Sequence, residues 1–285
     1  MNWVRQPTFG IVAAGALLAS VPWLGVAPFY ESFLYLVCHW AILALSWNIL
    51  SGYSGYFSFG HGAFFGVGMY TSASLSANLG VPFLWTLPVA AAAAALLGLA
   101  LGAVVFRVKA VRGELFALLT LAVTFVVATI VLNTRIDGGP GISLGGVAIP
   151  KLGPTASSSL YLMALLAALA TLWIAYRIHA SKLGTGLFAI HDDEDVAEVM
   201  GVPTFRYKLV AFVIAGMMCG VAGFLLGNVT KFLTPEFMNW LRSGEILVMV
   251  LMGGMGTLFG PLFGAVAFLL IEEVLADLTQ HWQII

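Results

Sequence analysis

Titratable side chains gather in one polar interval, residues 181–208, of a chain that is otherwise almost wholly apolar. At its centre lies a run of one histidine and four acidic residues: His191, Asp192, Asp193, Glu194 and Asp195. A charged run of this kind is usually a solvated face, and we interpret its three aspartates in that way. The sequence shows no Cys/His spacing of a metal site, no nucleophile elbow and no Walker-type glycine loop. We therefore expect no catalysis, no metal site and no nucleotide site in this chain itself.

Apolar residues recur through the same interval at roughly helical spacing and predict a short amphipathic helix. Gly184 and Gly186 precede this helix, and Gly201 with Pro203 ends it. A helix so short is marginal alone in water, so it must pack against something. We expect its apolar face to dock in a groove. That face comprises Leu187, Ile190, Val196, Ala197, Val199 and Met200.

Composition places the chain in a membrane. Apolar residues make up 61% of its 285 residues and charged residues only 9%, whereas soluble domains carry about 25% charged residues. The mean hydropathy is +1.00. The net charge of −1 gives no indication of nucleic acid as a partner, and membrane lipid is the expected surrounding.

Apolar runs long enough to cross a hydrocarbon core of about 30 Å recur along the whole length. They cover about 9–27, 33–50, 60–79, 84–106, 114–134, 158–178 and 207–229. Residues 243–275 are too long for one crossing, and their glycines and Pro261 predict a break into two pieces. We predict an all-α integral membrane protein, a polytopic bundle of about eight to ten transmembrane helices that forms a single domain, 1–285.

Positive charge favours a cytoplasmic N-terminus. With alternating spans, eight basic residues fall inside: Arg5, Arg107, Lys109, Arg112, Arg177, Lys182, Arg206 and Lys208. Four fall outside: Arg135, Lys151, Lys231 and Arg242. This topology places residues 181–206 in the cytoplasm and the loop 135–157 on the outer side.

A second informative stretch, residues 51–70, reads SGYSGYFSFGHGAFFGVGMY. Glycine at this density weakens a helix by about 1 kcal/mol per residue relative to alanine. Broken backbone at membrane depth survives only where protein or a water-filled cavity covers its polar groups. The stretch therefore either lines a pathway or forms a turn with close helix packing. Its one ionisable side chain, His61, is either a hydrogen-bonded structural group or a proton relay.

A similar glycine pattern near the C-terminus, Gly253-x-x-Gly256-x-x-x-Gly260, echoes Gly52-x-x-Gly55-x-x-x-x-Gly60. Paired glycine-interrupted segments in two halves of a chain point to a transport site between them. We predict that both segments contribute to a translocation pathway. The predicted pathway residues are Gly52, Tyr53, Gly55, Ser58, Gly60, His61, Phe64, Gly253, Gly254 and Gly256.

Charged groups buried within spans would indicate ion coupling, but here they crowd the span ends, as in 107–114 and 231–245. A pathway with neither ion coupling nor a nucleotide site would take its energy from a partner. An ion-coupled secondary transporter or channel is the alternative reading of the same residues. A membrane scaffold without transport is a third.

Several motifs lie along nearly the whole chain: GYSGYFSFGHGAFFG at 52–66, GGPGI at 138–142, IHDDE at 190–194, MGV at 200–202, RYK at 206–208 and MGGMGTLFGP at 252–261. In this order they resemble the signature of the branched-chain amino acid ABC transporter permeases of the LivM-like type.

The resemblance implies one permease subunit of a multi-pass importer in the bacterial inner membrane. Its partners would be a second homologous permease subunit, two ABC ATPase subunits and a periplasmic substrate-binding protein. ATP and Mg would bind only to the ATPases. The polar interval would contain the coupling helix, residues 187–201. The coupling residues implied by the motif match are Gly184, Ile190, Glu194, Ala197 and Gly201.

One feature distinguishes this chain from the family pattern, and another leaves the identity of its substrate undetermined. The family commonly has basic residues around positions 185, 188 and 191, where this chain has Thr185, Phe188 and His191. We therefore expect the docking face of this chain to be less basic than is common in the family. Related systems carry amino acids, urea, aromatic acids or other amides, and we expect no fixed charge in the pathway that would clamp a carboxylate. The binding protein is then expected to select the substrate.

Overall fold

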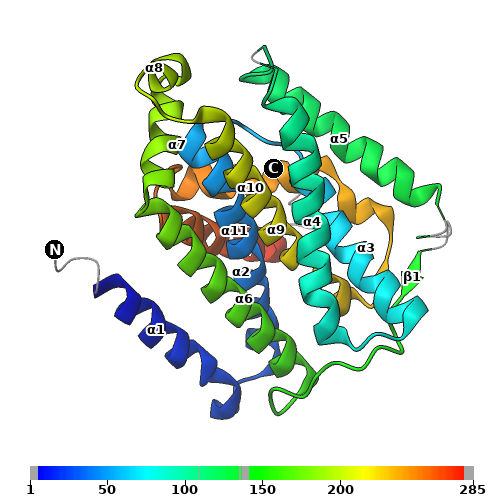
Figure 1. The fold of residues 1–285 in the computed structure, drawn as a ribbon. Coiled ribbons are helices and arrows are strands. Elements are labelled where there is room, and N and C mark those ends of the chain that lie inside the picture. The colour runs from blue at the N-terminus through cyan, green and yellow to red at the C-terminus, as the bar shows by residue number, and fades with distance from the viewer. Residues whose placement is uncertain (1–5, 109, 135, 137–140, 279–285) are drawn as a thin grey trace.

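The computed structural model describes residues 6–278 except 109, 135 and 137–140, and it is an all-α bundle, as predicted (Figure 1). The elements of the first half are α1 (Gln6–Ala19), η1 (Val21–Leu24), α2 (Pro28–Trp47), η2 (Asn48–Gly52), α3 (His61–Leu79), α4 (Phe83–Val105), α5 (Glu114–Leu132) and β1 (Ile142–Ser143). Those of the second half are α6 (Ala156–His179), α7 (Lys182–Asp192), α8 (Glu194–Val199), α9 (Thr204–Thr230), β2 (Phe232–Leu233), η3 (Pro235–Met238), α10 (Trp240–Gly253) and α11 (Gly260–Leu278).

Helices occupy every predicted span. Within the described residues, five are long and apolar enough to cross a membrane: Pro28–Gly52, Phe83–Val105, Glu114–Leu132, Ala156–His179 and Thr204–Thr230. The remaining predicted spans correspond to α1, α3, α10 and α11. The predicted break in residues 243–275 is confirmed, because α10 ends at Gly253 and α11 begins at Gly260.

The centre of the bundle is a tight packing of α3 against α9, with α4 covering both. Glycines make this approach possible. A Cβ added to Gly68 would lie 2.2 Å from the carbonyl oxygen of Gly220, and one added to Gly223 would lie 2.0 Å from that of Phe65. Backbones this close leave no room for a side chain, which is the usual role of small residues between membrane helices.

The two glycine-interrupted segments meet inside the bundle. The Asn48 side chain, fully buried in the π-helical turn η2, joins them: its Nδ2 donates to the Thr257 carbonyl (2.8 Å) and its Oδ1 accepts from the Gly256 N–H (2.9 Å). Asn48 therefore satisfies one donor and one acceptor in the α10–α11 turn. The sequence echo between the two halves corresponds to a direct contact.

Side chains from other helices satisfy backbone groups of Ser58 and Phe59 in the irregular segment 53–60. Trp47 Nε1 donates to the Ser58 carbonyl at 2.9 Å. The Phe59 N–H donates to Thr120 Oγ1 at 3.0 Å. The Phe59 carbonyl accepts from the hydroxyls of Thr124 on α5 and Ser243 on α10 at 3.0 and 3.1 Å. Protein therefore covers these polar groups, as broken backbone at membrane depth requires.

The loops group at two ends of the bundle. At one end, which we call the α7–α8 end, Tyr56 and Arg112 contact side chains of the segment 193–208. At the other, the β1–β2 end, Ile142 pairs with Leu233 in a short antiparallel ladder. There a buried carboxylate on α2, Glu31, accepts from Ser158 Oγ at the start of α6.

This grouping of the loops matches the alternation of sides predicted from the sequence. The cytoplasmic position of the α7–α8 end stays a prediction. Of the predicted outer loop 135–157, residues 135 and 137–140, which hold most of GGPGI, lie outside the described residues.

One predicted loop position is wrong. Arg242, assigned to an outer loop together with Lys231, lies in the first turn of α10. Its guanidinium is 5.4 Å from the ring centroid of Trp40, the central residue of the membrane-spanning segment Pro28–Gly52. The error arose because the chain turns back into the bundle after β2, through η3, which contacts α3 and α5.

We expect Asn48→Ala to lower stability by about 2 kcal/mol, because it leaves the Thr257 carbonyl and the Gly256 N–H without partners inside a membrane protein. The measurement is the midpoint of heat-induced loss of the folded species in detergent. Asn78→Ala removes an exposed amide of the same size and is the control. Equal midpoints for the two variants would show that the Asn48 bridge contributes nothing.

Candidate functional site

The polar interval folds into two helices rather than one. The predicted helix over 187–201 is interrupted at Asp193, whose backbone is extended (φ −162°, ψ 112°). Asp193 Oδ1 accepts from the N–H groups of Asp195 and Val196 at 2.9 and 3.0 Å and so caps α8. Aspartate is among the best N-cap residues, which explains why the helix stops and restarts here. Gly201, with φ 87°, ends the unit as predicted.

A buried ionic cluster joins this unit to the rest of the α7–α8 end. Lys208 Nζ lies 2.5 Å from Glu194 Oε1 and donates to Tyr56 Oη at 3.0 Å. The Tyr56 hydroxyl in turn donates to Glu194 Oε2. Only 5% of the Lys208 side chain and 10% of the Glu194 side chain are exposed. The cluster therefore links the loop after η2, the first turn of α8 and the second turn of α9.

Tyr56 keeps its proton in this cluster. Burial, together with the hydrogen bond to Glu194 and the charge of that residue, raises the pKa of Tyr56 above its ordinary value. The neutral hydroxyl can then accept from Lys208 and donate to Glu194 at the same time. Lys208 also lies over the Tyr56 ring, 4.5 Å from its centroid, in a cation–π contact.

Arg112 extends the cluster to the α4–α5 loop. It holds Asp195 in a two-pronged hydrogen bond, with Nη1 and Nη2 at 3.1 and 2.9 Å from the two carboxylate oxygens. Its Nε lies 3.5 Å from Glu194 Oε2. Asp195, predicted as part of a solvated face, is exposed but engaged in this pair. Such bidentate geometry fixes orientation as well as charge.

Helix α7 packs directly on both glycine-interrupted segments. The Phe188 ring lies 5.0 Å from that of Tyr53, and its Cε1 is 3.8 Å from the position that a Cβ on Gly256 would take. His191 Nδ1 is 3.1 Å from the corresponding position at Gly55, where φ is 73°. Phe188, partly buried, thus packs against both breaks at one of the three positions where basic residues were expected, whereas His191 touches Gly55 and stays exposed. The absence of a basic residue at position 188 has a packing reason.

The apolar residues of α7–α8 divide between two faces. Leu187, Ile190 and Ala197 are buried against the bundle. The remaining three form an exposed apolar patch on α8: Val196, Val199 and Met200. Val199 and Met200 are 87% and 78% exposed, so the predicted single docking face does not exist within this chain. Gly184 fits against the end of α6: a Cβ added to it would lie 2.4 Å from the carbonyl oxygen of Ile178.

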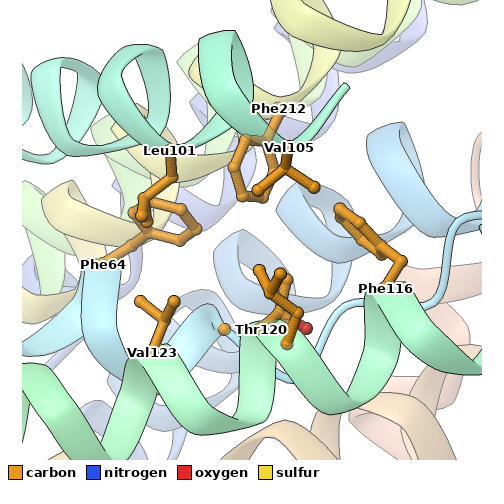
Figure 2. Close-up of a pocket in the computed structure, with 9 residues that line it drawn as sticks. Phe64, Leu101, Val105, Phe116, Thr120, Val123 and Phe212 are labelled. Carbon is orange, nitrogen blue, oxygen red and sulfur yellow. The ribbon is translucent and has the colours of Figure 1, made fainter. Parts of the chain in front are cut away.

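Six of the predicted pathway residues are buried, and four glycines, Gly55, Gly253, Gly254 and Gly256, are partly exposed. Gly60 and Phe64 border a cavity of only about 10 Å³, whose lining of Leu101, Val105, Phe116, Val123 and others is shown in Figure 2. Seven of the other pathway positions lie around the two breaks: Gly52, Tyr53, Gly55, Ser58, Gly253, Gly254 and Gly256. His61 is buried beside Phe64, at 6.3 Å between ring centroids. Their part in translocation stays a prediction.

Sequence reasoning about the site missed three residues: Tyr56, Arg112 and Lys208. Tyr56 and Lys208 stand in two of the quoted motifs, so a signal was present. What the motifs did not indicate is that these two residues contact each other and Glu194.

Comparison with known proteins agrees with the motifs. A family model described as "Branched-chain amino acid transport system / permease component" matches residues 29–283. The chain is 32% identical over 270 residues to the high-affinity branched-chain amino acid transport system permease protein LivM of Escherichia coli K12, which covers 84% of this chain and 62% of that protein. It therefore spans less than two thirds of the length of this relative.

More distant similarity extends to two other permeases. The LivH permease protein of the same kind of system from Salmonella typhimurium is 25% identical over 252 residues, 79% of this chain and 78% of that protein. The autoinducer 2 import system permease protein LsrC of Yersinia pseudotuberculosis is 30% identical over 115 residues, 39% of this chain and 33% of its own length. No solved structure matches. On the extent of the family match, this all-α membrane protein belongs to the LivM-like permease components of branched-chain amino acid transport systems.

Proposed function

We propose that this chain is a permease subunit of a binding-protein-dependent ABC importer for branched-chain or other hydrophobic amino acids. Partner ATPases drive alternating access, and a periplasmic binding protein delivers the solute. The observation that carries the proposal is the packing of Phe188 and His191 against Tyr53, Gly55 and Gly256. A surface helix pair is thereby in contact with both breaks in the membrane helices.

The exposed patch on α8 is the proposed contact for an ATPase. Large apolar side chains that stand out of a charged surface are typical of a partner interface. Gly201, which follows Met200, keeps the end of α8 open, since no atom lies within 4 Å of a Cβ placed there. Asp192 and Asp193, exposed beside the patch, form its polar rim.

Glu194 has a different proposed role from the exposed residues. Its carboxylate is occupied by Lys208, Tyr56 and Arg112, so it transmits force rather than touching the ATPase. A displacement of α8 would pull on the start of α9 through Lys208 and on the loop after η2 through Tyr56. Ala197, also on α8, is buried as well, with 3% of its surface exposed.

The remaining assignments follow from the family. The proposed complex contains a second homologous permease subunit and two ATPases, which bind ATP and Mg, and it lies in the bacterial inner membrane. The N-terminus and the α7–α8 end are then cytoplasmic. The binding protein docks at the β1–β2 end.

The function is tested by reconstituting the chain with its partner subunits and binding protein in liposomes. We expect L-leucine uptake to require ATP and the loaded binding protein, and to be insensitive to collapse of proton and sodium gradients. Uptake by the chain alone, driven by an ion gradient, would establish the ion-coupled alternative instead.

Met200→Glu should lower ATP hydrolysis stimulated by the loaded binding protein about tenfold, because an apolar interface residue becomes a desolvated charge. Asp192→Asn, an exposed change on the same unit, should have little effect. The assay is ATPase activity in the reconstituted complex, with co-purification of the ATPase as a second readout. Full stimulation of ATP hydrolysis in Met200→Glu would show that α8 is not part of the ATPase interface.

Lys208→Met should destabilise the chain by about 3 kcal/mol, because Glu194 is left buried without its closest cation. Adding Glu194→Gln should restore part of the loss, since the uncompensated charge is then gone. Thermal unfolding of the two single variants and the double variant in detergent measures this coupling, with Lys182→Met as the exposed control. Strictly additive losses would show that the pair acts as two independent residues.

A further inference from the structure

A charged residue, Arg242, lies level with the middle of the candidate membrane span Pro28–Gly52. The Arg242 guanidinium carbon is 4.5 Å from the ring centroid of Phe65 and 5.4 Å from that of Trp40. Trp40 has twelve residues on either side within the spanning segment Pro28–Gly52, which is about 18 Å of helix in each direction. Just before α10, Met238 packs against Gly66 of α3. Helix α10 thus begins inside the bundle as a half-helix.

The hydrogen-bonding edge of Arg242 has no partner from the described residues. The only close contacts of Arg242 to other helices that the structure gives among the described residues are the two cation–π contacts, with the Phe65 and Trp40 rings. Among the described residues Arg242 takes part in no hydrogen bond and in no ion pair within 4.0 Å. The side chain is also partly exposed. An oriented bidentate donor in a membrane protein is matched to a carboxylate.

An opposite charge stands close by on the same helix. Glu245 follows Arg242 by three residues, so the two side chains share one side of α10. Glu245 is exposed, and no ion pair joins it to Arg242. A carboxylate facing lipid at this depth is costly, so this side of α10 must face water or a partner. The positive end of the α10 dipole, at the same depth, favours an anionic group there.

Buried polar groups without partners adjoin the arginine. Tyr35 Oη and both ring nitrogens of His39 are buried with no hydrogen bond. The His39 ring lies 5.9 Å from those of Trp40 and Phe65, the two rings on which Arg242 rests. Unsatisfied buried groups usually mark a site that acquires water or ligand.

We propose that Arg242 binds the α-carboxylate and Glu245 the α-ammonium of an amino acid that crosses the membrane along α10. The exposed apolar residues Trp240, Leu241 and Val248 flank the pair and suit an apolar side chain. This site rests on the proposed import function and departs from the expectation of a pathway without fixed charge.

The first test uses the reconstituted complex with L-leucine. We expect Arg242→Gln to lower ATP-driven uptake about tenfold or more, the loss typical of a missing charge-assisted hydrogen bond. Complex assembly and ATP hydrolysis stimulated by the loaded binding protein should stay within about twofold of wild type. Arg242→Lys, which keeps the charge but not the fork, should raise KM and keep turnover. Lys151→Gln, an exposed basic residue at the β1–β2 end, is the control.

Two results of that test would overturn the site. Unchanged leucine uptake in Arg242→Gln would exclude substrate contact. Parallel loss of assembly, or of stimulated ATP hydrolysis, would assign Arg242 to helix packing or to the interface with another subunit.

A second measurement does not depend on transport. In the assembled complex, Glu245→Cys should react with a charged, membrane-impermeant thiol reagent at least about tenfold faster than Leu96→Cys, an exposed position at similar depth on α4. The native cysteines, Cys38 and Cys219, are buried and give little background. Equal rates would overturn the site. If wild-type complex imports no leucine, the proposed function fails, while the labelling rates still decide whether this face lines an aqueous path.

Discussion

A chain that interrupts its helices inside a membrane must supply hydrogen-bond partners for the freed backbone groups, because lipid has none to offer. Here the partners are side chains from other helices: Asn48 for the α10–α11 turn, and Thr120, Thr124 and Ser243 for the backbone of Phe59. Each break is therefore tied to at least one other helix. The two glycine-rich segments cannot shift independently, since the amide of Asn48 binds them together.

This tie gives α7 its mechanical importance. Phe188 and His191 rest on the same breaks that Asn48 joins, while Glu194 holds the start of α9 through Lys208. An inward-facing ring replaces a basic side chain at position 188, so the contact with the membrane helices is made by packing. What remains for a partner is the apolar patch on α8. Phe188, which packs on the breaks, and Met200, at the end of the exposed patch, are twelve positions apart in the sequence. This short path suits the proposed transmission of force.

The same breaks decide where charge can lie. Because the chain re-enters the bundle before α10, the first turn of that helix carries Arg242 to the level of Trp40. Cation–π contact with two aromatic rings offsets part of the cost of burying the guanidinium. A continuous helix would have placed Arg242 near a membrane surface, where a charged side chain gives no indication of a site.

Much of the fold follows from the sequence alone, because the length and hydropathy of an apolar run are local properties. The spans, the break within residues 243–275 and the end of the polar unit at Gly201 were all predicted on that basis. The family motifs also identified the unit that contacts both breaks. The sequence even contained the N-cap Asp193, but the apolar periodicity that runs through it concealed the helix end.

Only the tertiary structure decided which side chains meet. Tyr56 and Glu194 are 138 residues apart and Asn48 and Gly256 are 208 apart, and no local pattern encodes such pairings. The depth of Arg242 depends on the path of the chain through η3, which hydropathy cannot follow because that segment is short and mixed. Local sequence thus determined which segments are helical and apolar. Packing determined which breaks touch and which charged side chains meet.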